Sequence, residues 1–368
     1  MKVTLLHFKN IFSIALLLFI TPYSMTGQEE LVKYVNGNEL TVSGISKAGD
    51  PASFYRVDST LLNGLPATVK KLAKNPAGAA ILFKTDSRSI KVKWELEKYK
   101  IWWNMSPLTV NGMDLYGWNG SSWQYVASAR PSGTENKATI IDHMDGQMRH
   151  YMMYLPLYST LRSVSIGVEK DATIRKADPQ FLPKRSIAIY GSSITQGASA
   201  SRPGMAYPSI IGRAMQAEVY NFGFSGSGKM ELGAADFVRE SDADVYILDC
   251  VPNPSPEQIA FRTVPFVKRL RKSHPDTPVI MVESLFREHG HWDLKTGKRV
   301  TAQCRAFRDA YKQLVESGEK DIFYISNSKL IGDDHEATSD GTHLSDIGHH
   351  RIAQRLIKIL RESIQLPD

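Results

Sequence analysis

The sequence predicts an all-β sandwich followed by an α/β domain in which helices cover both faces of a parallel sheet. In the first half of the chain, short segments alternate apolar and polar residues and are separated by turn residues. In the second half, apolar strand patterns alternate with helical patterns, which is typical of a three-layer α/β/α domain. The pattern changes near residues 170–184. We therefore expect the sandwich within residues 28–178 and the α/β/α domain within residues 184–368.

Several strand patterns predict the sandwich. Residues 90–97 (IKVKWELE) alternate with a period of two, as a half-buried antiparallel strand does. Residues 115–118 and 123–126 flank Asn119-Gly120, which favours a hairpin because both residues tolerate a positive φ. Further short strands are expected at residues 80–84, 138–141, 151–155 and 164–168. No long helical pattern interrupts these strands, so both layers are expected to be sheets.

The second half follows a connector, residues 173–184, that contains two prolines. Apolar residues recur at helical spacing over residues 300–317 and again over residues 346–364. Strands are expected at residues 186–190, 218–222, 245–250, 279–283 and 322–325. Open α/β sheets bind ligands outside the carboxyl ends of their strands, so functional residues are expected there.

The N-terminus predicts export. Lys2 and Lys9 precede the apolar run of residues 11–20, and small or polar residues follow around residues 24–27. This is the pattern of a secretory signal peptide over residues 1–27, and the apolar run is too short to span a bilayer. No cysteine lies at the cleavage region, so a lipoprotein anchor is not indicated. We expect a periplasmic or secreted protein without stable membrane insertion after cleavage.

Charge and cysteine content argue against two classes of function. The formal net charge is +7, but the basic residues are spread along the chain, so nucleic acid is not an expected partner. Cys250 ends an apolar strand pattern, and Cys304 lies on the apolar stripe of a helix. We expect two buried free thiols, neither of them a nucleophile or a metal ligand. The oligomeric state is not predicted.

Small groups of polar residues follow the predicted strands or precede the last helix. Ser193 follows the first strand of the α/β domain, in AIYGSSITQG. Gly226 follows the second strand in NFGFSGSG, and Asn253 follows the third in DCVPNP. Asp340 and His343 stand three positions apart just before the final helix. Because the carboxyl ends of parallel strands meet at one edge of a sheet, we expect these residues to lie close together.

These residue types match the needs of acyl transfer. A serine can act as the nucleophile, a histidine as its base, and an aspartate can orient the histidine. A glycine N–H, an asparagine amide and the serine's own N–H can donate hydrogen bonds to a developing oxyanion. The sequence therefore predicts a serine hydrolase, with no metal and no other cofactor.

The same segments resemble the sequence blocks of the SGNH (GDSL-type) hydrolases, a family with a three-layer α/β/α fold. The resemblance implies Ser193 as the nucleophile and Asp340 and His343 as the acid and base. It also implies an oxyanion hole formed by Ser193, Gly226 and Asn253. Two positions depart from the family pattern: Ser192 replaces the usual aspartate before the nucleophile, and VPNP replaces the usual GxND. Neither departure removes a member of the triad or the oxyanion hole, but both bear on the acyl pocket.

The segment Gly112-Met113-Asp114-Leu115-Tyr116 resembles the GxDLY signature of a β-sandwich domain found ahead of some SGNH esterases. The sandwich contains no candidate nucleophile, base or oxyanion donor. We expect it to cover an apolar face of the hydrolase and to form one wall of the substrate cleft. The short connector, with its prolines and apolar residues, favours docking of the two parts.

Some histidines and tryptophans have more than one interpretation. His289, His291 and Trp292 lie in a polar stretch that should overhang the active site, as a solvated loop or as a substrate contact. The histidines His289 and His291, with His349 and His350 later in the chain, could suggest zinc. However, His349 and His350 are adjacent on a helix and face different directions, and no cysteine or carboxylate cluster completes a site.

Two further alternatives concern an acid and the aromatic residues of the sandwich. Asp346 could also orient His343, although its place at the start of the last helix favours a capping role. Four tryptophans of the sandwich could stack on sugar rings, although positions in the core or at the domain interface are the favoured interpretation. These are Trp102, Trp103, Trp118 and Trp123.

Residues and resemblance together predict an exported esterase that hydrolyses short-chain esters, acetyl esters above all, of small molecules or polysaccharides. The residues themselves predict only a hydrolase, and the carbohydrate follows from the resemblance and from export. One alternative is a lipase or thioesterase for longer acyl chains, against which the polar loops argue. Another is an inactive carbohydrate-binding protein, against which the complete set of five site residues argues. The sugar and the position of the ester are not predicted.

Overall fold

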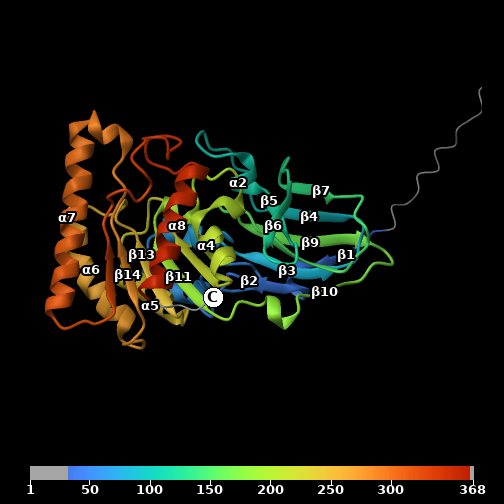
Figure 1. Cartoon of the computed structure of the whole chain (residues 1–368), viewed down its shortest axis with the longest axis horizontal. Helices are drawn as coiled ribbons and strands as arrows, with labels where there is room; N and C mark the ends of the chain where they lie inside the picture. Colours follow the sequence, from blue (N-terminus) through green and yellow to red (C-terminus); the bar gives the residue numbers. More distant parts are fainter. Residues whose placement is uncertain (1–31, 365–368) are drawn as a thin grey trace, which may run out of the picture. The chain divides into compact units, whose positions relative to one another are not determined.

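The computed structural model describes residues 32–364, in which two antiparallel sheets precede one parallel sheet (Figure 1). The predicted signal peptide lies outside the described residues. The first sheet has the order β1 (Val32–Asn36), β9 (Leu161–Glu169), β4 (Ile90–Leu96), β7 (Glu135–Ile141). The second sheet has the order β10 (Ile174–Lys176), β3 (Ala80–Thr85), β8 (Arg149–Tyr154), β5 (Met113–Trp118), β6 (Trp123–Ala129), with β2 (Thr41–Ser43) also paired to β3.

The two antiparallel sheets form the predicted sandwich. One apolar core joins side chains of β3, such as Ile81, to side chains of β4, such as Val92 and Trp94. The alternation seen in the sequence of β4 explains this, because residues two apart in a strand point to the same face. The hairpin predicted at Asn119-Gly120 joins β5 to β6, and Gly120 has a φ of +103°.

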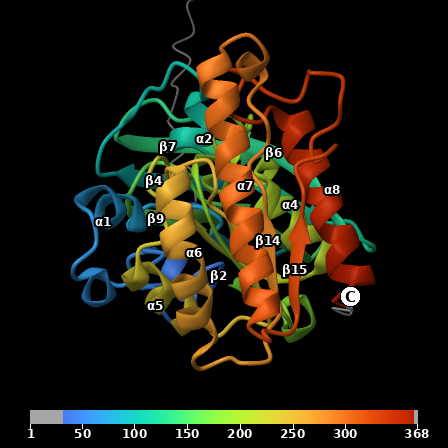
Figure 2. The ribbon, with the colours of Figure 1, turned by 90° about the vertical axis from the view of Figure 1, so that its left-hand side faces the viewer.

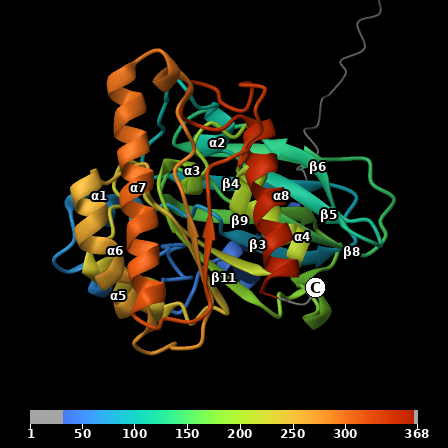
Figure 3. The same cartoon turned by 60° about the vertical axis from the view of Figure 1, so that its left-hand side comes forward.

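The parallel sheet has the order β12 (Glu218–Gly223), β11 (Ser186–Gly191), β13 (Val245–Asp249), β14 (Val279–Val282), β15 (Ile322–Ile325). One face is covered by α4 (Tyr207–Met215) and α8 (Asp346–Glu362), and the other by α5 (Leu232–Glu240), α6 (Pro256–Arg271) and α7 (Leu294–Glu316). Figure 3 shows α6 and α7 on one side of the strands and α8 on the other. The three-layer fold is therefore confirmed.

α7 begins six residues before the predicted start at Val300, because the Asp293 side chain accepts hydrogen bonds from the N–H groups of Lys295 and Thr296.

The remaining helices are short. The short α-helices are α1 (Ala67–Ala73), α2 (Pro107–Asn111) and α3 (Ser193–Gln196). The 3₁₀ helices are η1 (Gly37–Glu39), η2 (Ser59–Leu62), η3 (Pro179–Phe181), η4 (Pro203–Met205) and η5 (Glu288–His291).

The sandwich half, residues 32–178, and the predicted hydrolase half, residues 184–364, share a core. Leu62, Val69 and Ala73, which precede β3, belong to the same buried cluster as the helices α5 and α6. Figure 2 shows α1 beside these helices. The fully buried guanidinium of Arg56 donates hydrogen bonds of 2.6 and 2.8 Å to the carbonyl oxygens of Asn221 and Gly223 in β12. The expected docking is thus extensive, and the residues from 32 onward cluster as one compact unit.

The Gly112–Tyr116 motif also lies at this junction. The buried carboxylate of Asp114 forms an ion pair with Arg202 and accepts a hydrogen bond of 3.0 Å from the Gly204 N–H. The Tyr116 hydroxyl accepts a second hydrogen bond from Arg202, at 2.6 Å. The segment so held, residues 202–204, begins six residues after the end of α3 (Ser193–Gln196), so the motif joins the sandwich to the chain just beyond Ser193.

Among residues 32–364, no helix is both long enough and apolar enough to cross a bilayer.

Candidate active site

Ser193 is the first residue of α3, immediately beyond the carboxyl end of β11. The Ser192 hydroxyl caps this helix by accepting a hydrogen bond of 3.2 Å from the Ile194 N–H. The turn requires glycine at position 191, because a Cβ atom there would lie 1.8 Å from the Thr195 Oγ1. The Ser193 N–H belongs to the first turn of α3, whose amides have no intrahelical acceptor.

The structure brings the three predicted triad residues together. The Ser193 Oγ lies 2.9 Å from the His343 Nε2, and the His343 Nδ1 lies 2.7 Å from the Asp340 Oδ2. Asp340 and His343 belong to the loop between β15 and α8, which is closed by a bridge between Thr338 and Leu344. Both distances are hydrogen-bond distances, so the three side chains have the geometry of a nucleophile, its base and an acid that orients the base.

Asp340 is held as a carboxylate. Burial acts to raise its pKa, but hydrogen bonds from the His343 backbone N–H, the His343 ring and the Asn104 amide together outweigh burial and lower the pKa to about 2. An ionised Asp340 accepts the Nδ1–H of His343, which leaves the Nε2 lone pair directed at the serine hydroxyl.

The predicted oxyanion donors lie on the loops after β12 and β13. Gly226 has a φ of +68°, and a Cβ at this position would meet no atom within 4 Å. The Asn253 Oδ1 accepts a hydrogen bond of 3.2 Å from the Gly228 N–H, so the Nδ2 of the same amide points away from Gly228. A Cβ on Gly228 would lie 2.1 Å from the Gly191 carbonyl oxygen. The loop after β12 therefore packs directly against the turn before Ser193, and the loop after β13 is bonded to it through Asn253.

A buried acid that the sequence analysis did not single out supports this turn. Asp249, the last residue of β13, accepts hydrogen bonds of 2.9 Å from both the Thr195 Oγ1 and the Tyr207 hydroxyl. Burial raises the pKa of Asp249 to about 7, although both hydrogen bonds act to lower it. Asp249 ties α3 to the central strands and to α4, behind the nucleophile.

Asn104 is a site residue that sequence reasoning missed. It lies in the sandwich half, between β4 and α2, and its Nδ2 donates a hydrogen bond of 2.8 Å to the Asp340 Oδ2. The same nitrogen lies 3.3 Å from the His343 Nδ1. Its backbone oxygen accepts a hydrogen bond of 2.7 Å from Ser199, just beyond α3. A single asparagine in a loop carries no pattern by which the sequence could have indicated this contact.

Tyr158 brings a second side chain of the sandwich half to the site. Its hydroxyl donates a 3.3 Å hydrogen bond to the Ser193 carbonyl oxygen, and its ring packs against Trp102 at a centroid distance of 6.1 Å.

The core interpretation of Trp102 and Trp103 is wrong: their exposed fractions are 44% and 86%. Both lie in the loop that carries Asn104, which projects past the sandwich core to the hydrolase half. Trp118 and Trp123 instead pack against Phe181 of the connector, as expected for interface residues.

The segment after β14 lies beside the loop that carries Asp340 and His343, called the catalytic loop below, as its position in the sequence predicts. The Glu288 N–H donates a hydrogen bond of 2.9 Å to the Gly341 carbonyl oxygen, and Trp292 follows with an exposed fraction of 88%. His349 is not part of this group, because it is buried between the Tyr207 N–H and the Ala198 carbonyl oxygen.

Two smaller expectations are confirmed. Asp346 lies in the first turn of α8, where it accepts hydrogen bonds from Ser201, so Asp340 alone contacts His343 among the two acids considered. Cys250 and Cys304 are both buried and free.

The fold and this Ser–His–Asp arrangement are those of the serine hydrolases. The model of the GDSL-like lipase/acylhydrolase family matches residues 184–361, and the model of the N-terminal domain of SGNH hydrolase-type esterases, GxDLY, matches residues 32–174. A solved structure of a GDSL-like lipase from Bacteroides ovatus is 40% identical, with a TM-score of 0.87 over 91% of this chain and 98% of that one. The chain therefore belongs to the GDSL-like lipase/acylhydrolase family and carries its GxDLY N-terminal domain.

More distant structures share the fold. The salicylyl-acyltransferase SsfX3 of a tetracycline biosynthetic pathway is 18% identical, with a TM-score of 0.71 over 91% of this chain and 98% of that one. A family two carbohydrate esterase from Cellvibrio japonicus is 14% identical, with a TM-score of 0.61 over the same shares of the two chains. An acetyl xylan esterase from Butyrivibrio proteoclasticus is 12% identical, with a TM-score of 0.55 over 91% of this chain and all of that one. No curated protein matches the chain significantly.

Proposed function

We propose that the protein is an exported serine esterase that removes short acyl groups, acetyl in particular, from carbohydrate. The observation that carries the proposal is the continuous chain of hydrogen bonds from the Ser193 Oγ through the His343 ring to the Asp340 carboxylate. Such a chain activates a hydroxyl that is a weak nucleophile by itself.

In the first half of the reaction, the Ser193 Oγ attacks the ester carbonyl carbon while its proton passes to the His343 Nε2. The carbonyl oxygen becomes an oxyanion, which accepts hydrogen bonds from the N–H groups of Ser193 and Gly226 and from the Asn253 Nδ2. The imidazolium then donates its proton to the leaving alcohol oxygen as the carbon–oxygen bond breaks. The products of this step are the free alcohol and an acylated Ser193.

In the second half, a water molecule gives a proton to the His343 Nε2 and attacks the acyl carbon. The collapse of this second intermediate releases the carboxylic acid and returns the proton to the Ser193 Oγ. The Asp340 carboxylate remains ionised throughout, because it stabilises the imidazolium and keeps the His343 ring in one orientation. Asn104 holds the same carboxylate oxygen from the opposite half of the chain.

A short acyl group fits the residues around the nucleophile. The loops beside Ser193 consist of small and polar residues, namely residues 225–228, 252–255 and 339–342. Gly226 is exposed and open, whereas a long acyl chain needs an apolar surface to bury its methylene groups. This composition favours acetyl esters over the long-chain substrates of a lipase or thioesterase.

A carbohydrate acceptor is supported by exposed tryptophans and by relatives. Trp103 precedes Asn104, and Trp292 follows the segment bonded to Gly341, so each lies on a segment that contacts the catalytic loop. Exposed aromatic side chains grouped at a site are a common sign of ligand binding. Two proteins of the same fold are described as a carbohydrate esterase and an acetyl xylan esterase. Export, proposed from residues 1–27, would give access to such polymers.

A panel of substrates tests the proposal. We expect the purified protein to cleave 4-nitrophenyl acetate faster than the butyrate and octanoate esters, and to release acetate from acetylated xylan. The Ser193→Ala variant serves as the blank for each substrate. Preference for octanoate would indicate a lipase or thioesterase, and binding of xylan without release of acetate would indicate a carbohydrate-binding protein. Fractionation of cells that produce the full chain would test export.

A further inference from the structure

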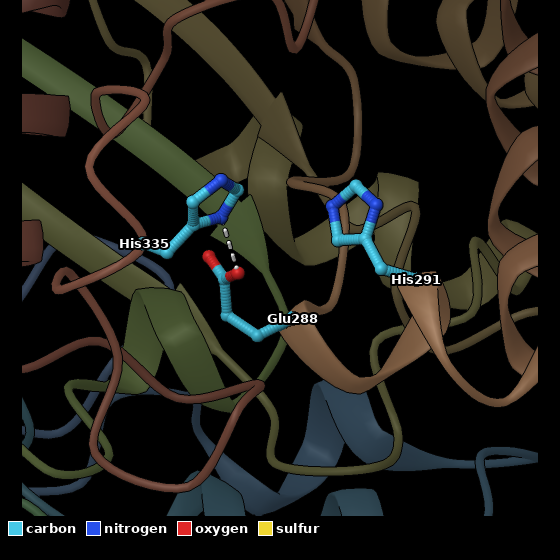
Figure 4. A group of neighbouring side chains, drawn as sticks. All are labelled: Glu288, His291 and His335. Atoms are coloured by element: carbon cyan, nitrogen blue, oxygen red, sulfur yellow. Dashed lines mark hydrogen bonds and ion pairs between the residues drawn. The ribbon is translucent and has the colours of Figure 1, made fainter.

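Three side chains that can bind a metal ion meet beside the catalytic loop: Glu288 and His291 of η5, and His335 of the loop between β15 and α8 (Figure 4). One ligand atom from each lies within 4.8 Å of the other two. The carboxylate of Glu288 lies 2.8 Å from the His335 Nδ1, and the two imidazole rings have centroids 5.6 Å apart. The sequence did not predict this set, because His291 was considered with His289, His349 and His350 and not with Glu288 and His335.

An ion pair between Glu288 and His335 would explain the positions of these two side chains but not the position of His291. His291 lies on the other side of Glu288 from His335, as Figure 4 shows, and its ring packs on Phe286 at a centroid distance of 4.6 Å. Among the described residues, no hydrogen bond joins a ring nitrogen of His291 to a protein atom. Packing thus orients this ring while leaving its nitrogens available for a ligand.

The three residues match a borderline divalent transition-metal ion. Zinc takes imidazole nitrogens at about 2.0–2.1 Å and carboxylate oxygens at about 2.0–2.2 Å, usually with four ligands. Tetrahedral ligand atoms at these distances are about 3.3 Å apart, so the widest pair must close by at most about 1.5 Å. His291 and His335 are both exposed and can make this adjustment by rotation of their side chains. A water molecule or an external group would supply the fourth ligand.

We propose that Glu288, His291 and His335 form a binding site for one divalent transition-metal ion, with zinc as the best match. The site would add a metal-mediated link between two segments that already meet through a backbone hydrogen bond. One is η5, whose Glu288 N–H bonds to the Gly341 carbonyl oxygen, and the other is the loop that carries Asp340. The ion therefore stabilises the loop of the acid and base, and it takes no part in the acyl transfer itself.

Titration of the full-length protein with zinc tests this site without reference to esterase activity. After treatment with EDTA and removal of the chelator, we expect the protein to bind one equivalent of Zn²⁺ in calorimetry and to melt at a higher temperature with zinc than without it. Because a site with two remaining ligands is much weaker, His291→Ala and His335→Ala should each raise the Kd at least tenfold. Both variants should lose the thermal shift.

The matched control is His350→Ala, which removes an exposed histidine of α8 outside the cluster. It should bind zinc as the unaltered protein does. Circular dichroism without metal checks that each variant is folded, and Glu288→Gln, which keeps the size of the side chain, provides a third test of the same site. Equal zinc affinity in all variants, or no stoichiometric binding by the unaltered protein, would overturn the proposal. Neither result would bear on the proposed esterase activity.

Discussion

The two halves of the chain place polar residues at their junction for different purposes. In the hydrolase half, Ser193, His343 and Asp340 form a chain of hydrogen bonds. In the sandwich half, Asp114 and Arg56 are buried at the junction and bond to the hydrolase half. Asn104 belongs to the sandwich half but contacts the acid of the triad. The difference teaches that the candidate catalytic side chains are concentrated in one half, whereas their alignment depends on contacts from both halves.

The largest expected effect is in the hydrolase half. Ser193→Ala and His343→Ala should each lower kcat by about 10⁶-fold, and the double variant should be no worse, because both residues serve one proton transfer. The measurement is the rate of 4-nitrophenyl acetate cleavage. Ser192→Ala, which removes the neighbouring hydroxyl and costs about 1 kcal/mol of helix capping, is the control and should remain active. A Ser193→Ala variant with near-normal kcat would refute the mechanism.

The next effect, in the sandwich half, should appear in stability. Asp114→Asn leaves the Arg202 guanidinium without its buried partner and should reduce the free energy of unfolding by about 3–5 kcal/mol, as measured in urea. Asp145→Asn removes an exposed partner of Arg149 and should change stability little. The folded fraction of Asp114→Asn should keep most of its kcat. Equal stabilities of the two variants would show that the motif does not hold the junction.

Asn253 separates stabilisation of the transition state from binding of substrate. Asn253→Ala removes one oxyanion donor and should lower kcat by about 10²–10³-fold with little change in KM. Steady-state kinetics with 4-nitrophenyl acetate provide both constants. A loss confined to KM would instead make Asn253 a residue that binds substrate in the ground state.

Asn104 tests whether the sandwich half contributes to rate. Removal of a hydrogen bond to a charged group costs about 1.5–3 kcal/mol, so Asn104→Ala should lower kcat by about 10- to 100-fold at similar KM. Asn104→Asp should be more damaging, because it sets a second negative charge beside Asp340. A normal kcat for Asn104→Ala would show that the hydrogen bond from the sandwich half contributes nothing to the rate.

The smallest expected effect is a pH dependence of stability shared by both halves. The pKa of Asp340 is about 2 in the folded protein and near 3.8 when unperturbed, so its ionised form stabilises the fold above about pH 4. This contribution, about 1–2 kcal/mol after allowance for solvent screening, is lost as the pH falls toward 2. Urea unfolding between pH 5 and pH 2.5 should therefore show a steeper loss for the unaltered protein than for Asp340→Asn. Asn104→Ala should lie between them, and identical slopes for all three would contradict the assigned hydrogen bonds.

Local patterns determined much of this protein. Alternating residues in a strand and apolar stripes on a helix are properties of short segments, so the sequence alone predicted the sandwich, the parallel sheet and the last helix. The carboxyl ends of parallel strands share one edge, which is why Ser193, Gly226 and Asn253 could be predicted as neighbours. Asp340 and His343 were predicted for the same reason and because they stand close together in the sequence.

Only the tertiary structure decided the contacts between distant segments. Asn104 meets Asp340 across 236 positions of sequence, and Glu288 meets His335 across 47. Neither contact has a spacing that a local pattern could reveal, because it depends on how the sandwich docks and how two loops pack. The same holds for Trp102 and Trp103, which sequence reasoning placed in a core or an interface. Their exposure results from a loop that leaves the sandwich core and brings Asn104 to Asp340 of the other half.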